Sequence, residues 1–190
     1  MSEYKKVTPE LIAKFKEIAP GRVSVDGDIN DDFTHDEMPI YGKATPEVVV
    51  EAQTTEEVAA VVKLCNENNI PVTPRGAGTG LTGGAVAIDG GIIITTPKMN
   101  KILAYDKENM NVRVQAGVLL QELADDAAKY GFLYPPDPGE KLATLGGNVS
   151  TNAGGMRAVK YGATRDYVRS MTVVLPTGEI VKFGASVSKT

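Results

Sequence analysis

Glycine is distributed unevenly along this sequence, and that feature constrains the fold most. The chain has 20 glycines among 190 residues, above the average share of about 7%. Many of them gather in two stretches, residues 76–91 and 146–155. Glycine tolerates positive φ and lets the main chain approach a ligand closely, so backbone atoms form the surface where glycines gather. We therefore look for a binding site in these two stretches.

The remaining composition is that of an ordinary globular protein. Its 190 residues suit one domain or two small lobes that share a core. The net charge of −4 argues against a nucleic-acid partner, because non-specific nucleic-acid binders are usually basic. With one histidine and one cysteine, a His/Cys metal site is excluded, and we expect no bound metal.

No segment predicts a membrane span or a secretory leader. The apolar runs fall short of the roughly 20 residues that a membrane span needs, and residues 91–95 form a run of strand size. The first ten residues lack the apolar region of a signal peptide. We therefore expect a cytoplasmic protein without a membrane span.

The periodicity of apolar residues predicts a mixture of helices and strands. Residues 47–52, 56–68 and 71–73 are predicted as a strand, a helix and a strand, which make a β-α-β unit with parallel strands. Thr54 and Glu57 form a capping-box pattern at the start of its helix. Residues 20–45 lack periodicity and are expected to be irregular. Further helices are predicted at 8–19 and 118–130, strands at 91–95, 102–105 and 111–115, and a β-hairpin from 167–175 and 179–183.

The loop Pro74–Gly84, PRGAGTGLTGG, overlaps the start of the first glycine stretch. This loop has the composition of a phosphate-binding loop. Successive glycines let backbone N–H groups turn inward to form a nest for an anion. Thr79 and Thr82 add hydroxyl donors, while Arg75 adds positive charge nearby or forms a structural ion pair. The loop lacks the Gly-Lys-Ser/Thr ending of a Walker motif. Its Gly-x-Gly-x-x-Gly spacing matches a Rossmann fingerprint, but no convincing helix follows, so we expect a diphosphate nest of another kind.

The second stretch, Thr144–Gly155, reads TLGGNVSTNAGG and follows the rigid segment PPDPG at residues 135–139. Small residues permit tight backbone turns, and Asn, Ser and Thr supply hydrogen-bond donors and acceptors. Taken alone, the stretch is equally consistent with tight turns that bind nothing. Two such clusters in one small domain favour a binding site.

Four segments together resemble a known family. PVTPRGAGTGLTGG, YPPDPGEKLATLGGNVSTNAGG, KYGATRDYV and VLPTGEIVKFG resemble the FAD domain of the FAD-linked oxidase superfamily, the type found in vanillyl-alcohol oxidase and p-cresol methylhydroxylase. Within it, the pattern resembles the glycolate oxidase D-subunit and D-lactate dehydrogenase group. The segment FTHDEM near residue 35 resembles electron-bifurcating lactate dehydrogenases that work with electron-transfer flavoproteins.

The resemblance implies a fold and an activity. The fold is α+β, an FAD-binding domain of the p-cresol methylhydroxylase (PCMH) type with two α+β subdomains and FAD between them. We expect an N-terminal helix and lead-in segment over residues 1–41 and the FAD domain over 42–190. The implied activity is oxidation of a small 2-hydroxy acid, such as D-lactate or glycolate, with electrons passed to an electron-transfer flavoprotein or another acceptor. The chain ends at Thr190, before the family's substrate-capping domain, so we expect a truncated chain with no catalytic residues and no activity of its own.

The resemblance also assigns FAD contacts to both glycine stretches. Relatives that bind FAD covalently use a histidine near the place of Thr79, and since this loop has none, we expect non-covalent FAD. The first stretch would wrap the diphosphate, the second would line the flavin and its ribityl chain, and Ala153 and Gly154 would pack close to the cofactor. The expected contacts are Pro74, Arg75, Gly76, Ala77, Gly78, Thr79, Gly80, Leu81, Thr82, Gly83, Gly84, Pro138, Thr144, Gly147, Asn148, Thr151, Ala153, Gly154 and Gly155.

Alternatives remain open at this point. The chain is alternatively a truncated FAD-binding module without activity, or part of a sugar-lactone or cell-wall-precursor oxidoreductase of the same fold, which the pattern at 148–155 fits less well. His35 is interpreted as a solvated turn residue, unless its segment reaches the flavin or a partner. Asp137 is interpreted as a turn former, with a hydrogen bond toward the ribityl chain as the alternative. Cys65 is expected to be a buried, inert thiol.

Overall fold

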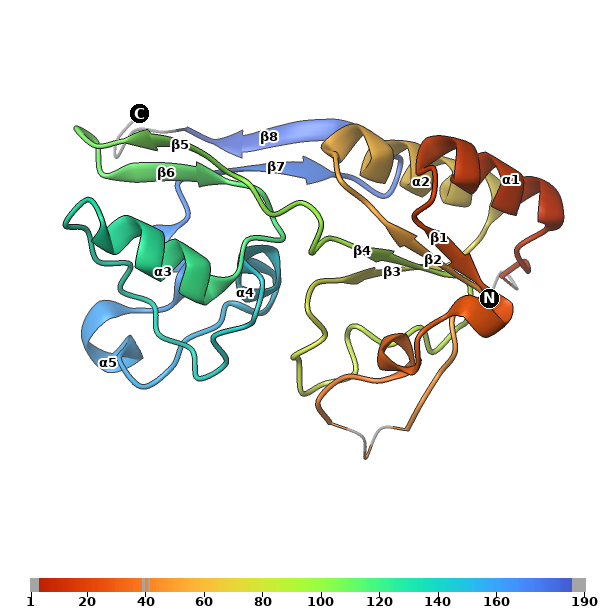
Figure 1. Cartoon of the computed structure of the whole chain (residues 1–190), viewed down its shortest axis with the longest axis horizontal. Helices are drawn as coiled ribbons and strands as arrows, with labels where there is room; N and C mark the ends of the chain where they lie inside the picture. The colour runs from red at the N-terminus through yellow and green to blue at the C-terminus, as the bar shows by residue number, and fades with distance from the viewer. Residues whose placement is uncertain (1–3, 39, 41, 186–190) are drawn as a thin grey trace.

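Two lobes lie side by side in the computed structural model, which describes residues 4–38, 40 and 42–185 (Figure 1). The first lobe is built on a four-stranded sheet with strand order β1-β2-β4-β3. Strand β1 runs antiparallel to β2, whereas β2 and β3 both run parallel to β4. Its elements are α1 (Pro9–Ile18), β1 (Val23–Val25), β2 (Val48–Glu51), α2 (Thr55–Asn68), β3 (Val72–Arg75) and β4 (Ile92–Thr95).

The sheet of the first lobe is buried on both faces, which explains its uninterrupted apolar strands. Helices α1 and α2 cover one face, where Phe15 and Val61 pack against Val48 and Ile92. On the other face, Val49 and Ile93 form a second cluster with Ala87, and Ile29 and Phe33 pack against it. The segment around Phe33 therefore packs directly on the face of the sheet opposite the helices.

The prediction of a parallel β-α-β unit is confirmed, and so is the helix expected at 8–19. The expectation that residues 20–45 are irregular is wrong for β1 and for two 3₁₀ helices, η1 (Asp26–Asp28) and η2 (Asp31–Thr34). These pieces are too short to produce a periodic pattern of apolar residues. Strand β1 forms because it pairs with β2, a contact between segments far apart in the sequence.

A half-buried ion pair joins β1 to the start of α2. The two terminal nitrogens of Arg22 donate to both carboxylate oxygens of Glu57 at 2.7 and 2.6 Å, and one of them also donates to the Glu51 carbonyl. Thr54 caps α2 by accepting from the Glu57 N–H, as the capping pattern predicted, while the Glu57 side chain accepts from the Gln53 N–H. The hydrogen bond from Arg22 is the largest cause that holds the pKa of Glu57 below its ordinary value.

Replacing Glu57 with glutamine is therefore expected to lower the free energy of unfolding by about 2 kcal/mol at pH 7. The pKa of Glu57 is lower in the folded chain than in the unfolded chain. The stability that the ionised Glu57 adds is therefore fully present above the unfolded pKa of about 4.3, and it is lost as the pH falls through the pKa of the folded chain. Urea denaturation from pH 7 to pH 3 measures this, with the exposed neighbour in Glu56→Gln as control. A gap between E57Q and the wild type that stays constant down to pH 3 would contradict the assignment.

The second lobe packs two hairpins around short helices. Its small core is formed by Val118, Leu120, Leu123 and Leu145, with Val112 packed against them. The expected helix at 118–130, the expected strands at 102–105 and 111–115 and the expected hairpin near the end of the chain are confirmed. The elements are β5 (Ile102–Asp106), β6 (Asn111–Val114), α3 (Leu120–Ala128), α4 (Leu145–Thr151), α5 (Ala158–Tyr161), the 3₁₀ helix η4 (Thr164–Tyr167), β7 (Ser170–Val174) and β8 (Ile180–Gly184).

Two connections hold the lobes together. The chain passes from β4 to β5 beside Gly117, which lies so close to the carbonyls of Thr96 and Met99 that a side chain there would overlap them. The β7–β8 hairpin runs back from the second lobe to α2 (Figure 1), and its turn residue Gly178 packs on Lys63. Among the described residues, no helix has the length and apolar character that crossing a bilayer requires.

Candidate functional site

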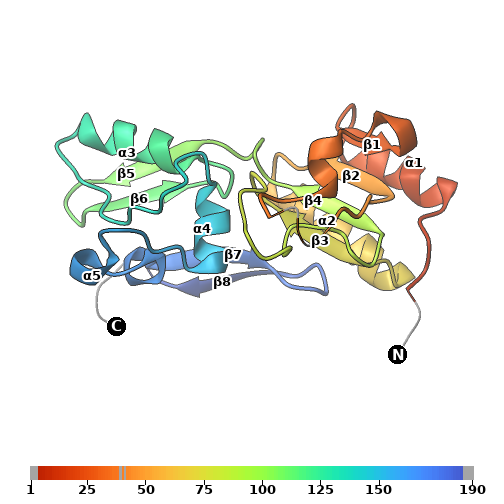
Figure 2. The same ribbon diagram turned by 90° about the horizontal axis from the view of Figure 1, so that it is seen from below.

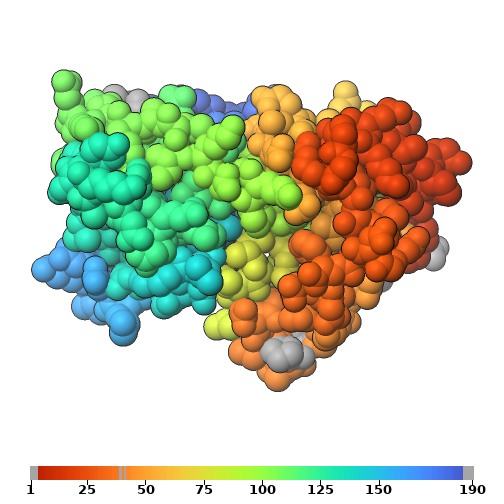
Figure 3. Space-filling model, viewed as in Figure 1, coloured from red at the N-terminus to blue at the C-terminus, as the bar shows by residue number. Residues whose placement is uncertain are grey.

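The first glycine stretch follows β3 directly, at the carboxyl end of the parallel strands, where ligands bind in many α/β sheets. Gly78 and Gly83 adopt φ values of +77° and +75°, which favour glycine strongly. Residues 84–91 contain turns and no helix, so the prediction that this loop is not a Rossmann turn is confirmed. The loop lies where the two lobes meet, and its yellow atoms are visible there in the space-filling view (Figure 3).

The backbone N–H groups of this loop are arranged as free donors. Among the residues that the structure describes, none accepts a hydrogen bond from the N–H groups of Gly76–Thr82. The Gly83 N–H, in contrast, donates to the carboxylate of Asp36 at 2.6 Å. A run of donors without protein acceptors is available to bind an anion.

The second glycine stretch forms a helix, α4, that the sequence did not predict. Thr144 is the N-cap residue, and its hydroxyl accepts from the Gly147 N–H at 3.2 Å. Gly146 packs so closely on the Cβ and the carbonyl of Ala116 that a side chain at position 146 would overlap them. Glycines are poor helix formers, and here the cap and this close packing override their propensity.

The two glycine stretches meet in space. Gly76 lies against Thr144, and a methyl group at position 76 would overlap the Thr144 hydroxyl. Figure 2 shows α4 facing the first stretch across the boundary between the lobes. Segments nearly 70 positions apart in the sequence therefore form one continuous surface of small residues.

Asn148 on α4 has a buried polar group without a partner. The residue is 3% exposed, and its side-chain nitrogen Nδ2 has no hydrogen-bond partner among the described residues. Leaving a buried donor unpaired costs about 1–3 kcal/mol, so native proteins rarely keep one without a reason. An acceptor on a bound cofactor would satisfy this donor.

The loop that follows α4 is anchored to residues 135–139. Gly155, at φ +113°, packs against the backbone of Asp137 in a position that excludes a side chain. The Asp137 carboxylate pairs with Lys141 and with Arg157, whose Nε lies 3.1 Å away. The hydrogen bond from Lys141, aided by the charge of Arg157, holds the pKa of Asp137 below its ordinary value. Asp137 thus fixes the course of two loops.

The Arg75 side chain brings positive charge close to the loop, as the first of the two expectations had it, and it forms no ion pair with the described residues. Its buried guanidinium donates to the backbone carbonyls of Asp32, His35 and Ala85 at 2.7, 2.9 and 3.1 Å. Burial lowers the pKa of Arg75, and the nearby carboxylates of Asp36 and Asp32 act in the opposite direction. The positive charge of Arg75 therefore lies beneath the glycine loop, while the hydrogen bonds of its guanidinium go to backbone carbonyls.

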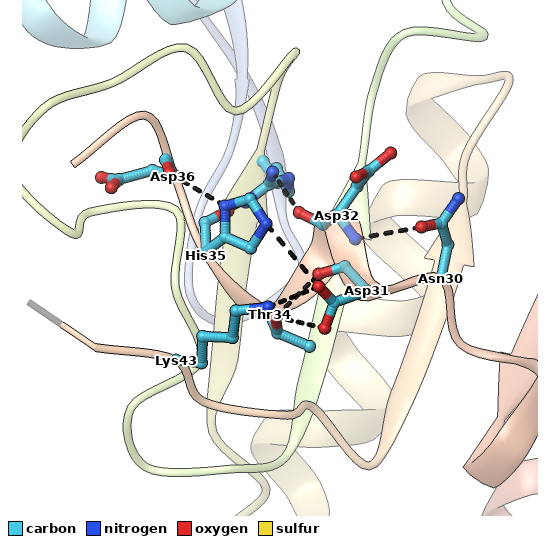
Figure 4. A network of polar contacts seen from close by, with 8 residues as sticks. Asn30, Asp31, Asp32, Thr34, His35, Asp36 and Lys43 are labelled. Carbon is cyan, nitrogen blue, oxygen red and sulfur yellow. Dashed lines mark hydrogen bonds and ion pairs between the residues drawn. The ribbon is translucent and has the colours of Figure 1, made fainter. Parts of the chain in front are cut away.

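The segment 31–37 is the part of the site that sequence reasoning missed. The His35 ring is half-buried, with Nδ1 3.0 Å from the Asp36 carbonyl and Nε2 4.0 Å from the Asp31 carboxylate (Figure 4). Asp36 is 4% exposed and bonds the glycine loop. The polar run around His35 was the sequence feature that could have indicated this contact, but we interpreted His35 there as a solvated turn residue.

The other expected contacts lie in or beside the two stretches. Their roles toward FAD stay predictions, because they follow from position alone. Pro138 is buried, Thr79, Gly80, Gly147, Ala153 and Gly154 are half-buried, and Pro74, Ala77, Leu81, Thr82, Gly84, Thr151 and Gly155 are exposed. Cys65, as expected, is fully buried, and burial raises the pKa of its thiol to about 12.

Curated relatives match all or most of the chain. It is 76% identical over 192 residues to a D-lactate dehydrogenase of Anaerostipes hadrus, covering 100% of this chain and 40% of that protein. It is 39% identical over 158 residues to the glycolate oxidase subunit GlcD of Bacillus subtilis (strain 168), covering 83% of this chain and 33% of that protein. The chain thus spans about 40% or less of the length of these relatives.

Solved structures and a family profile agree with them. An alkyldihydroxyacetonephosphate synthase matches 97% of this chain and 36% of its own with a TM-score of 0.83 and 25% identity. A p-cresol methylhydroxylase with substrate bound matches 94% of this chain and 36% of its own with a TM-score of 0.79 and 27% identity. The profile of the FAD binding domain matches residues 46–184. The chain belongs to the FAD binding domain family, with the PCMH-type fold and FAD as its cofactor.

Proposed function

We propose that FAD binds non-covalently across the boundary between the two lobes. The diphosphate takes the free N–H groups of Gly76–Thr82, and the flavin end lies along α4 and the loop after it. The unpaired Asn148 donor carries this proposal, because it is buried on the helix whose N-cap residue, Thr144, meets the first glycine stretch, and it has no partner among the described residues. The absence of histidine from the loop supports a non-covalent attachment.

FAD, when bound, supplies the group that accepts a hydride and passes electrons on. The chain's own residues bind and orient it. The loop N–H groups hold the negative charge of the diphosphate, and the Asn148 amide donates to an acceptor on the cofactor. Gly155 lets the loop after α4 pack against the backbone of Asp137. The domain limits at residues 41 and 42 belong to this proposal, and residues 186–190 of the expected domain lie outside the described residues.

For the whole protein we propose oxidation of a small 2-hydroxy acid, D-lactate or a close analogue, to the 2-oxo acid. The identity to a D-lactate dehydrogenase and to a glycolate oxidase subunit supports this substrate class. The FTHDEM segment supports an electron-transfer flavoprotein as acceptor, and a cytoplasmic location remains a prediction. The alternative of an FAD-binding module without activity is what we expect of residues 1–190 tested alone, since they span 40% of the first relative.

The test compares two proteins loaded with FAD and mixed anaerobically with D-lactate. The full-length protein is expected to lose its flavin absorbance near 450 nm, whereas residues 1–190 keep it. Acid precipitation of either protein is expected to leave all yellow colour in the supernatant. Flavin retained on the precipitated polypeptide would contradict non-covalent binding. Bleaching of the flavin in the 190-residue chain by D-lactate would contradict the expectation that this chain binds FAD but does not oxidise the substrate.

A further inference from the structure

We propose that Asp36 and Arg75 are positioning residues that hold the glycine loop in the shape that receives the diphosphate. We call the segment 32–36 together with the Arg75 side chain the loop clamp. The inference rests on the proposed function, because it concerns how the same loop is shaped. It assigns to polar residues of the segment before β2 a role in shaping the FAD site, which the proposed function does not give them.

The Arg75 guanidinium closes the base of the loop. Arg75 ends β3, so its backbone marks the start of the loop, and its side chain donates to the Ala85 carbonyl just past the loop's end at 3.1 Å. The same group donates to Asp32 and His35 from the clamp segment. One buried cation thus joins both ends of the loop to the segment beside it. The cation also lies 5.7 Å from the centre of the Phe33 ring.

The loop is wrapped around this guanidinium. A Cβ atom at Gly78 would overlap the terminal nitrogen of Arg75, so the loop backbone passes directly over the cation. This contact requires glycine at position 78 for space as well as for its φ of +77°. The course of the N–H groups on either side of Gly78 therefore depends on where the Arg75 side chain lies.

Asp36 fixes the far half of the loop. Its Oδ2 accepts from the Gly83 N–H at 2.6 Å, and its Oδ1 accepts from the Met38 N–H at 2.9 Å. The neighbouring Glu37 N–H donates to the Gly80 carbonyl at 3.1 Å. The Gly80 carbonyl thus faces the backbone of Glu37, and the Gly83 N–H is occupied by the Asp36 carboxylate. The N–H groups before Gly83 remain as the donors available to a ligand.

The charge of Asp36 argues for positioning and against direct binding. A carboxylate repels the diphosphate that the neighbouring N–H groups are expected to hold, so Asp36 does not contribute as a ligand. Its burial at 4% exposure is compensated by two N–H donors and by the nearby Arg75. The value of the carboxylate to the site lies in the shape that it gives the loop.

The experiment measures the FAD dissociation constant of the full 190-residue chain by flavin fluorescence. Glu37→Ala is the matched control, because Glu37 is an adjacent, exposed acid outside the clamp whose backbone N–H bonds the loop and whose side chain forms no hydrogen bond or ion pair with the described residues. D36A is expected to raise the constant about tenfold or more, the scale of one charge-assisted hydrogen bond. E37A is expected to stay within about twofold of the wild type. D36N keeps one acceptor oxygen in place of two, so it is expected to rise about threefold to tenfold.

Circular dichroism of each FAD-free variant shows the temperatures at which the variant is fully folded. FAD binding is then measured at a temperature at which all variants are folded. A folded D36A that binds FAD like E37A would overturn the inference. If D36A does not fold, D36N decides, and a value equal to that of E37A overturns it. A wild-type chain that does not bind FAD would instead refute the proposed function, so the two failures are distinguishable.

Discussion

Asn148→Leu is expected to raise the free energy of unfolding of the FAD-free chain by about 1 kcal/mol while weakening FAD binding by about tenfold or more. The structure leaves the Nδ2 of Asn148 buried and unpaired in the absence of a ligand. Leucine has a similar volume and no polar atom, so it removes the penalty of the unpaired donor and also removes the donor that FAD needs. Stability and binding should therefore change in opposite directions.

Urea denaturation of the FAD-free chain and titration with FAD measure the two effects. Ser150→Ala is a suitable control, because Ser150 is exposed on the same helix and its hydroxyl bonds the Gly146 carbonyl and no other described residue. It should leave both quantities nearly unchanged. An Asn148→Leu chain that is less stable than the wild type and binds FAD normally would show that Asn148 is a structural residue.

Gly78→Ala is expected to destabilise the chain by about 3 kcal/mol and to disturb the loop that receives the diphosphate. Both the φ of +77° and the overlap with the buried Arg75 side chain oppose alanine there. Gly83→Ala is a closely matched control, since its φ is +75° and nothing lies within 4 Å of the added Cβ. The control isolates the strain of positive φ, about 1 kcal/mol.

The difference between these two variants, about 2 kcal/mol, reports the contact between the loop and the guanidinium. Chemical denaturation of both chains at one temperature measures it directly. Equal losses in the two variants would mean that the backbone does not pass over Arg75 as described.

The sequence predicted the elements whose signals are local. The valines and isoleucines of β2 and β4 form apolar runs typical of strands buried on both faces, and Thr54 begins α2 with a standard cap. Helix α4 escaped prediction because Gly146 and Gly147 have low helix propensity, and the helix depends on packing against Ala116 from another segment.

The sequence predicted the glycines of the candidate site but not the residues that hold the glycine loop in place. Both stretches were recognised because glycine, Asn and Thr in close succession have a local meaning. The bonds from Arg75 to His35 and from Gly83 to Asp36 join residues 40 and 47 positions apart, and no local pattern reports such pairs. The sequence therefore indicates where the cofactor contacts lie, and only the fold shows what holds them in shape.

An amide NMR titration of the ¹⁵N-labelled chain with FAD reports directly on whether the glycine loop binds the diphosphate. We expect the N–H resonances of Gly76–Thr82 to shift on binding and to exchange more slowly with solvent, together with the Asn148 side-chain amide. ADP, which carries the diphosphate without the flavin, should shift the loop resonances and leave the Asn148 side chain unchanged. FAD binding that leaves the amides of Gly76–Thr82 unperturbed would contradict the assignment of this loop to the diphosphate.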